Sequence, residues 1–205
     1  MWPRTYCRVN VTVMSVESTK AAMRKQALER RKLVTSQERH AFAEHLAGEG
    51  VRLARARPGV KVVAAYWPLA EEADTFPLLR ALADAGFTTA LPVTVGAGRP
   101  MLFRRWAPGD TLVKASFGLS EPEPGQPVVE PEVLFIPLAA FDRRGHRIGY
   151  GKGHYDATLA QFRETRDVLA VGVAFGRQEI PDVPDEEHDQ KLDFVITEDE
   201  LIDFG

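Results

Sequence analysis

Nearly continuous apolar segments alternate with helical segments along most of the chain, and this alternation constrains the fold more than any other feature. A strand that is buried on both faces is apolar throughout, and parallel strands need helical connections between them. The expected main strands lie at residues 61–69, 88–95, 132–142, 168–175 and 193–197. The sequence therefore predicts an α/β fold, with a mostly parallel sheet flanked by helices.

An N-terminal pair of helices is expected before the first strand. Ser18 and Thr19 can cap a helix that continues through Arg31. Thr35 followed by Glu38 is typical of a capping box, which predicts a second helix that ends at the next Arg-Pro-Gly. This helical pair would precede the alternating part of the fold.

The remaining segments fit the same pattern. Asp74 can cap a third helix, which Gly86 ends, and a fourth helix is expected over about residues 155–165. Residues 101–108 suggest a short strand, whereas residues 121–127 are so rich in proline and glycine that we expect a surface connector there.

Composition limits the class of protein. The 44% hydrophobic and 27% charged residues are typical of a globular chain. The longest clearly apolar run, at residues 133–141, is far shorter than the roughly 18 residues that a membrane-spanning helix needs. The net charge of −3 argues against a nucleic-acid partner. We therefore expect neither nucleic acid nor a membrane as a partner.

The length of 205 residues suits a single domain, which we expect over residues 18–205. Residues 1–17 would be an N-terminal extension that could be disordered, and Met14 could be the true start. They lack the apolar stretch of a signal peptide, and the single cysteine, Cys7, cannot form an internal disulfide. We expect a cytoplasmic monomer.

The stretch RIGYGKGHYD sets three glycines at alternating positions between an expected strand and helix, where open α/β sheets bind ligands. Gly149, Gly151 and Gly153 let the backbone approach a ligand, and the helix N-terminus adds positive charge. Lys152 supplies a mobile charge, and Arg147 supplies a planar fork for phosphate oxygens. The spacing matches no standard phosphate motif. The loop predicts a phosphate site, with a simple tight turn as the alternative.

Four charged residues elsewhere could complete such a site. Asp156 follows the loop and Asp189 precedes the last expected strand, and Mg²⁺ binds through one or two carboxylates plus phosphate oxygens. The alternatives are that Asp156 offsets the helix dipole and that Asp189 lies in a solvated acidic loop. Lys20 and Arg24 share a helix face. They would join the site only if that face folds over the glycine loop.

Several motifs together resemble those of the 5-formyltetrahydrofolate cyclo-ligase family. KAAMR, YWPLAEEADT, FGLSEP, PLAAFDRRGHRIGYGKGHYD and VPDEEHDQKLD occur in the order and approximate spacing of that family, over residues 18–202. The resemblance implies a cyclo-ligase-like domain and an ATP- and Mg²⁺-dependent carbon–nitrogen ligase. ATP would phosphorylate the formyl oxygen of 5-formyltetrahydrofolate, N10 would attack the activated carbon, and 5,10-methenyltetrahydrofolate, ADP and phosphate would be released.

The resemblance also implies roles for individual residues. Lys152, Arg147 and Arg24 would be catalytic, and Asp156 and Asp189 would hold Mg²⁺. The implied ATP-binding residues are Lys20, Arg24, Arg147, Gly149, Tyr150, Gly151, Lys152, Gly153, His154 and Tyr155. The implied substrate-binding residues are Leu69, Asp74, Tyr150, His154 and Tyr155.

Three positions leave questions open. His154 stands where the family usually has tyrosine, which makes that surface smaller and protonatable. Tyr150 occupies a position that is sometimes basic in the family. Trp106 could stack on the pterin ring, although a half-buried tryptophan is more often part of the core.

Two other functions remain possible from the sequence. The chain could be an ATP-using relative that acts on another substrate, or a non-catalytic protein that stores 5-formyltetrahydrofolate. Storage requires neither Lys152 and Arg147 nor the two carboxylates, so these residues favour an enzyme.

Overall fold

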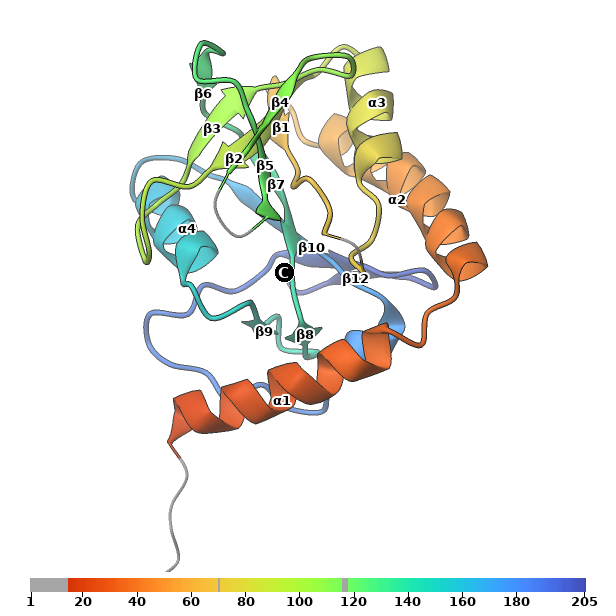
Figure 1. Cartoon of the computed structure of the whole chain (residues 1–205), viewed down its shortest axis with the longest axis vertical. Coiled ribbons are helices and arrows are strands. Elements are labelled where there is room, and N and C mark those ends of the chain that lie inside the picture. Colours follow the sequence, from red (N-terminus) through yellow and green to blue (C-terminus); the bar gives the residue numbers. More distant parts are fainter. Residues whose placement is uncertain (1–14, 70, 116–117) are drawn as a thin grey trace, which may run out of the picture.

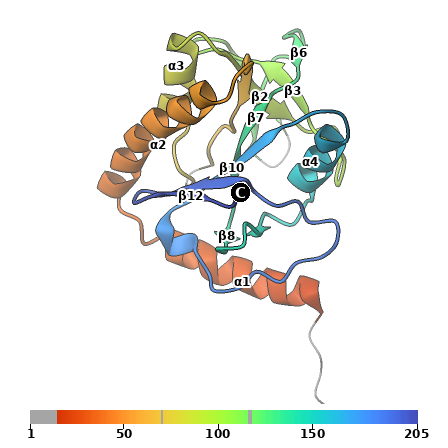
Figure 2. The ribbon, with the colours of Figure 1, turned by 180° about the vertical axis from the view of Figure 1, so that it is seen from behind.

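The computed structural model describes residues 15–69, 71–115 and 118–205. A central sheet of eight strands runs through the molecule, with helices on both of its faces (Figure 1). Figure 2 shows the same layers from behind. The predicted fold class, a mostly parallel sheet flanked by helices, is confirmed.

The sheet is parallel in its centre and antiparallel at its edges. In spatial order its strands are β12 (Leu201–Asp203), β11 (Phe194–Ile196), β10 (Leu169–Val173), β7 (Val133–Pro137), β1 (Val62–Ala64), β2 (Thr88–Val93), β3 (Leu102–Arg105) and β6 (Val128–Val129). From β11 to β2 all neighbours are parallel, as near-continuous apolar strands predict.

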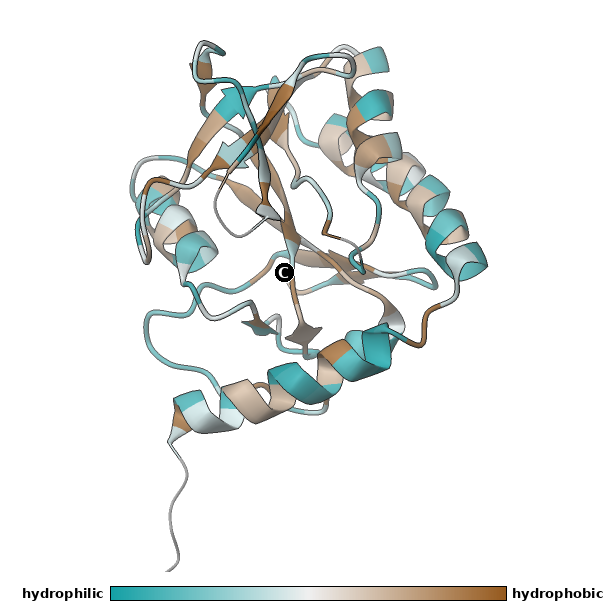
Figure 3. Cartoon of the chain, in the orientation of Figure 1, coloured by the Kyte–Doolittle hydropathy of each residue, from teal (hydrophilic) through white to brown (hydrophobic). Residues whose placement is uncertain are grey.

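Helices bury both faces of this sheet. The helices on the two faces are α2 (Ser36–Ala56), α3 (Phe76–Asp84) and α4 (His154–Thr165); α1 (Val16–Arg31) and the short 3-10 helix η2 (Gly176–Gln178) lie elsewhere. Phe42 of α2 and Leu78 of α3 share a core with Phe135 of β7, whereas Leu159 of α4 shares the opposite core with Leu134. Neighbouring residues of one strand thus serve two cores, because side chains alternate across a strand. Figure 3 shows the apolar strands between more hydrophilic helix surfaces.

Helix α1 lies apart from these two layers, at the end of the molecule that is lowest in Figure 1. It packs near η2 and the short strand β8 (Ala140–Phe141), which pairs with β9 (Arg147–Ile148). Only three of its side chains are buried, and two of these are charged: Lys20, Ala27 and Arg31. Polar contacts therefore account for much of its attachment.

The start of α1 differs from the sequence prediction. The helix begins at Val16, and Ser15 is its N-cap, with a side chain that accepts a hydrogen bond from the Ser18 N–H. The prediction that Ser18 and Thr19 cap the helix is wrong, because an earlier serine already satisfies these amides. Of the predicted extension, residues 1–14 lie outside the described residues.

The starts of α2 and α3 agree better with prediction. The Thr35–Glu38 capping box of α2 is confirmed in both directions. In α3 the N-cap is Thr75, and the Asp74 Oδ1 accepts a hydrogen bond of 2.9 Å from the Phe76 N–H. Asp74 thus caps the helix from one position further out than expected.

Some strands were not foreseen, and one connector is shorter than expected. Strand β5 (Ser120–Pro122) pairs with β4 (Leu112–Lys114), so the predicted connector at residues 121–127 begins inside a strand. The strand predicted over residues 132–142 is divided into β7 and β8, and the alternation missed β4, β6, β9 and β12, because strands of two or three residues are too short to show a period.

The topology directs attention to one edge of the sheet. From β1 the chain moves outward to β2, β3 and β6, and it then returns to β7 on the other side of β1. The order therefore reverses between β1 and β7, and open α/β sheets bind ligands beyond the carboxyl ends of the strands at such a point. Across the described part of the chain, no helix combines the length and apolar character that a membrane crossing needs.

Candidate active site

A cleft of about 910 Å³ opens at this reversal point. Residues at or just beyond the carboxyl ends of β1, β2 and β7 line it, including Tyr66, Thr94 and Pro137. One side, the glycine-loop wall, is formed by residues 147–156 with Glu186 and Asp189. The other side, the aromatic wall, is formed by Tyr66, Trp67, Leu69 and Glu72.

Nearly every site residue predicted from the sequence lines this cleft. Those brought together are Lys20, Arg24, Leu69, Arg147, Gly149, Tyr150, Gly151, Lys152, Gly153, His154, Tyr155, Asp156 and Asp189. Asp74 is the exception among the predicted residues: its side chain is exposed at the start of α3.

The glycine loop has the backbone that its sequence predicts. Gly151 and Gly153 have φ values of 79° and 65°, in the left-handed region that favours glycine. Gly153 is also the N-cap of α4, so the loop leads directly into a helix N-terminus. A Cβ on Gly151 would lie 3.4 Å from the Arg24 guanidinium. That distance is an ordinary contact, so the positive φ, rather than crowding, favours glycine here.

Helix α1 does fold over the glycine loop, which was the condition for Lys20 and Arg24 to matter. The Arg24 Nε donates a 2.6 Å hydrogen bond to the Gly149 carbonyl. The Lys20 Nζ lies 2.6 Å from the Asp189 carboxylate and 3.0 Å from that of Glu186. Burial lowers the pKa of Lys20, but the two carboxylates outweigh it and leave the pKa above its ordinary value.

Arg147 is placed differently from the phosphate grip that its planar fork suggests. Its side chain is only 4% exposed, and its Nη2 donates a 2.7 Å hydrogen bond to the Asp156 Oδ1. Its Nη1 donates to the Gln190 carbonyl. Burial lowers the pKa of Arg147, while Asp156 and Asp189 oppose that shift. The observed contacts orient Asp156, and a direct role toward phosphate stays a prediction.

The two carboxylates proposed as magnesium ligands each keep one oxygen outside these bonds. The hydrogen bonds recorded for Asp156 use Oδ1, and those for Asp189 use Oδ2. Within residues 15–69, 71–115 and 118–205, no three acidic, histidine or cysteine side chains cluster as a metal site. Two carboxylates fit Mg²⁺ when phosphate oxygens complete its coordination, so the residues suit a metal that arrives with a nucleotide.

The aromatic wall contains a carboxylate that the sequence interpretation missed. Glu72 is 7% exposed, and its Oε2 accepts a 2.8 Å hydrogen bond from the Leu69 N–H. Burial raises the pKa of Glu72, although the hydroxyl of Tyr150, the Leu69 N–H and Arg31 oppose it. An adjacent pair of acids, Glu71 and Glu72, offers no sequence signal that singles out the buried one.

Tyr150 joins the two walls. It belongs to the glycine loop, yet its hydroxyl donates a hydrogen bond to the Glu72 Oε1 and accepts one of 2.6 Å from the Arg31 Nη1. Tyr150 is 37% exposed as a residue, but its hydroxyl lies between Glu72 and Arg31; loss of solvent there, together with the Glu72 charge, raises the pKa of Tyr150, so the phenol keeps its proton. Arg31 is a second functional candidate. The sequence did not reveal it, because it is one of several basic residues in α1 and nothing in the pattern distinguishes it from the others.

The remaining candidates have simpler surroundings. Lys152 is exposed at the rim of the cleft, and its carbonyl accepts a 3.2 Å hydrogen bond from the Gly98 N–H. The His154 Nδ1 lies 3.3 Å from the Arg99 carbonyl. Trp106 is 2% exposed and makes an edge-on contact with Trp67, with ring centroids 5.5 Å apart. Trp106 therefore belongs to the core, and Trp67 is the tryptophan that faces the cleft.

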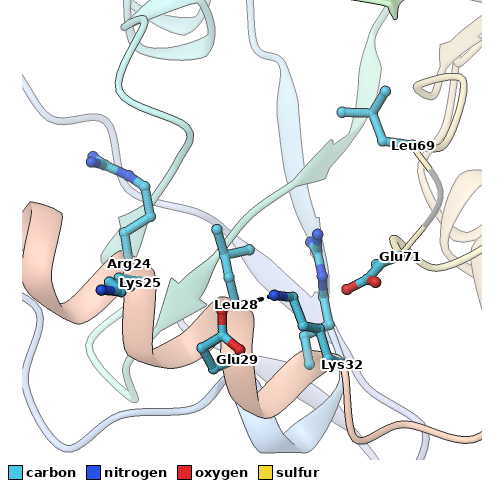
Figure 4. Close-up of a pocket in the computed structure, with 8 residues that line it drawn as sticks. Arg24, Lys25, Leu28, Glu29, Lys32, Leu69 and Glu71 are labelled. Carbon is cyan, nitrogen blue, oxygen red and sulfur yellow. Dashed lines mark hydrogen bonds and ion pairs between the residues drawn. The ribbon is translucent and has the colours of Figure 1, made fainter.

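A smaller hollow of about 510 Å³ adjoins the cleft and shares Arg24 and Leu69 with it. Figure 4 shows side chains that project into it from α1 and from the loop across from α1: Arg24, Lys25, Leu28, Glu29, Lys32, Leu69 and Glu71. Lys32 and Glu29 pair at 2.8 Å on this surface. Leu69 of the aromatic wall thus borders both the cleft and the smaller hollow.

Comparisons with known proteins agree with this geometry. A 5-formyltetrahydrofolate cyclo-ligase of Mycolicibacterium smegmatis is 33% identical over 189 residues, which cover 87% of this chain and 93% of the relative. One from Escherichia coli is 36% identical over 141 residues, or 66% of this chain and 76% of the relative.

Solved structures show the same fold. The NMR structure of Aquifex aeolicus 5,10-methenyltetrahydrofolate synthetase has a TM-score of 0.71 and 28% identity, and the match covers 90% of this chain and 92% of that one. A sequence model described as the 5-formyltetrahydrofolate cyclo-ligase family matches residues 16–198. The resemblance noted in the motifs is confirmed, and this chain belongs to the 5-formyltetrahydrofolate cyclo-ligase family.

Proposed function

We propose that this enzyme converts 5-formyltetrahydrofolate to 5,10-methenyltetrahydrofolate, with ATP as co-substrate and Mg²⁺ as cofactor. The names of its relatives and of the Aquifex structure support the substrate and the product. The observation that carries the proposal is a cleft with two unlike walls, one charged and rich in glycine, the other aromatic with one buried carboxylate. A triphosphate suits the first wall, and a flat ring with hydrogen-bond donors suits the second.

The formyl oxygen is a poor leaving group, so its phosphorylation makes ring closure feasible. ATP would phosphorylate this oxygen, N10 would attack the formyl carbon, and phosphate would leave with the former formyl oxygen. Positioning and charge neutralisation dominate catalysis of phosphoryl transfer. Bound Mg²⁺ would neutralise charge on the phosphates, held by Asp156 and Asp189.

On the glycine-loop wall, Lys152 would stabilise the negative charge that develops as the phosphoryl group moves. The alternating glycines would present backbone N–H groups to the phosphates, and Arg24 supports the loop through the Gly149 carbonyl. Arg147 would act mainly by fixing Asp156, because its guanidinium is committed to that carboxylate and to the Gln190 carbonyl.

On the aromatic wall, Glu72 would accept hydrogen bonds from the donor edge of the pterin ring. A carboxylate accepts hydrogen bonds only, and this one is buried in the cleft and held by the Leu69 N–H and Tyr150. Leu69 and Trp67 would pack against the ring. Glu72 therefore takes the role first given to Asp74, whose carboxylate is exposed and caps α3.

One assay tests this function directly. Protein, MgATP and 5-formyltetrahydrofolate are mixed, and the methenyl product is followed by its near-ultraviolet absorbance, with ATP omitted as a control. Product formation that depends on ATP supports the proposal. Folded protein that binds 5-formyltetrahydrofolate without making product would instead indicate storage, and ATP consumption with a different amide would indicate another substrate. The cytoplasmic location and the monomeric state stay predictions.

A further inference from the structure

Three side chains form a hydrogen-bonded series that leads from the smaller hollow into the cleft. The Arg31 Nη1 donates to the Tyr150 Oη over 2.6 Å, and the Tyr150 hydroxyl donates to the Glu72 Oε1. Arg31 and Glu72 are each 7% exposed. The three residues come from the end of α1, the glycine loop and the aromatic wall, so this chain connects segments that are distant in sequence.

Other residues contact both ends of this hydrogen-bonded series. The second carboxylate oxygen of Glu72 accepts from the Leu69 N–H at 2.8 Å. Arg39 of α2 donates to the Arg31 carbonyl at 3.1 Å and to the Glu71 carbonyl at 2.5 Å. The Glu72 carboxylate is thus contacted at both oxygens, and Arg39 ties the backbone at Arg31 to the backbone of the aromatic wall. The Tyr150 hydroxyl lies between these two segments, so it can transmit a change on one side to the other.

The protonation states favour a defined direction in this chain. Burial raises the pKa of both Tyr150 and Glu72, and the negative charge of Glu72 adds to the effect on the phenol. The phenol therefore remains a donor toward Glu72, while the arginine can only donate to it. Tyr150 sits in a glycine loop next to Gly151 (φ 79°), a backbone that depends on side-chain contacts to select one conformation.

We propose that Tyr150 is a positioning residue that couples the two walls. Substrate bound to Glu72 fixes that carboxylate, the carboxylate fixes the Tyr150 hydroxyl, and the hydroxyl holds the glycine loop in the conformation that receives the triphosphate. Because binding free energies are reciprocal, nucleotide in the loop must favour substrate on the aromatic wall by the same factor. This inference rests on the proposed function, since it needs both ligands in one cleft.

Coupling is measured as a ratio of dissociation constants. Calorimetry measures the Kd of the protein for a non-hydrolysable imido analogue of ATP in the presence of Mg²⁺. The measurement is made without and with saturating 5-formyltetrahydrofolate. We expect the wild type to bind the analogue at least about 5-fold more tightly in the presence of the folate. In Tyr150→Phe the ratio should fall below about 2, because the ring remains but the link to Glu72 and Arg31 is gone.

Tyr66→Phe is the matched control. It also removes one hydroxyl from a tyrosine that lines the cleft, but the Tyr66 hydroxyl donates to the Ala73 carbonyl within its own segment. Its folate affinity can change, whereas its coupling ratio should match that of the wild type. If Tyr150→Phe does not fold, the same ratio is measured in Arg31→Lys. This variant keeps the positive charge but loses the planar guanidinium that donates to the Tyr150 hydroxyl, so its ratio should also fall.

Several outcomes would overturn the inference. They are a wild type without coupling, a Tyr150→Phe variant that keeps the full ratio, or a Tyr66→Phe variant that loses as much. If the wild type makes methenyl product while any of these holds, only the coupling fails. If the wild type binds no 5-formyltetrahydrofolate and makes no product, the proposed function fails and the coupling with it.

Discussion

The two walls of the cleft are built by different physical means. The glycine-loop wall depends on ion pairs, such as Lys20 with Asp189 at 2.6 Å and Arg147 with Asp156 at 2.7 Å. The aromatic wall depends on burial: Tyr66 is 4% exposed, and its one carboxylate, Glu72, is 7% exposed. Charged groups around a flexible loop can follow charge that moves during a reaction, whereas a buried acceptor selects a ligand by its donors.

This contrast predicts that substitutions will separate into effects on turnover and effects on substrate binding. A variant in the glycine-loop wall should lower kcat, and a variant in the aromatic wall should raise KM for the folate. If variants in both walls changed kcat and KM for the folate alike, this separation of roles between the walls would be wrong.

The largest effect is expected for Lys152→Ala. Its charge matters most while the phosphoryl group moves, so kcat should fall about 10²–10³-fold, with folate Kd within about 2-fold of the wild type. Steady-state kinetics and calorimetry measure the two quantities. Lys25→Ala, which removes an exposed lysine from the neighbouring hollow, is the control. Equal loss of turnover and binding would contradict a role confined to the transition state.

Asp156→Asn and Asp189→Asn come next. Each should raise the Mg²⁺ concentration for half-maximal rate by at least about tenfold. Each should also lower Tm by several degrees, because Arg147 or Lys20 loses a partner while it remains buried. Metal titration and thermal melts separate the two effects. A lower Tm with normal metal dependence would assign that carboxylate to structure alone.

Glu72→Gln, compared with Asp74→Asn, tests the aromatic wall. Losing charged hydrogen bonds of about 1.5–3 kcal/mol should raise KM for the folate at least about tenfold in Glu72→Gln. Asp74→Asn should change KM less than about 3-fold, since its carboxylate caps a helix. The reverse ranking would restore Asp74 as the substrate ligand.

The raised pKa of Glu72 also predicts how folate affinity depends on pH. Its folded-state pKa lies above the ordinary value of 4.5, so the carboxyl takes up a proton earlier than an exposed acid as pH falls. We expect folate affinity in the wild type to weaken as pH falls from 7 toward 5, and Glu72→Gln to be flat over that range. By the same sign, any stability due to the protonated form is lost as pH rises through that raised pKa.

The smallest effect is expected for His154→Tyr. His154 lies on the glycine-loop wall, where its Nδ1 is 3.3 Å from the Arg99 carbonyl. The motif resemblance implies tyrosine at this position, so we expect kcat/KM to stay within about 3-fold of the wild type. A larger change would mean that the cleft has adapted around the smaller ring.

The two walls also differ in how well the sequence predicted them. In the glycine-loop wall, the loop itself was predictable because its geometry is local: Gly151 and Gly153 adopt the positive φ that only glycine takes readily. Lys20 and Asp189 join it through a contact that is distant in sequence, so their place there depended on how α1 folds. The parallel sheet was predictable for a similar reason, since burial on both faces leaves continuous apolar strands.

The aromatic wall was harder to predict because burial is decided by tertiary packing. Glu71, Glu72 and Asp74 look alike in sequence, but only Glu72 is buried in the cleft. Arg31 is one of several arginines in α1, and its role depends on a contact with Tyr150, more than a hundred residues away. Such contacts leave no short-range pattern, so the structure was needed to find them.

The sparse burial in α1 has a consequence for hydrogen exchange. Helix α2 buries seven residues against the sheet, whereas α1 buries three and is held largely by polar contacts. Segments with few buried apolar contacts open without unfolding the rest of the protein. The amide protons of α1 should therefore exchange well before those of α2, and each opening would carry Lys20 and Arg24 out of the cleft and Arg31 away from Tyr150. Ligands that contact these side chains would then protect a whole helix from exchange.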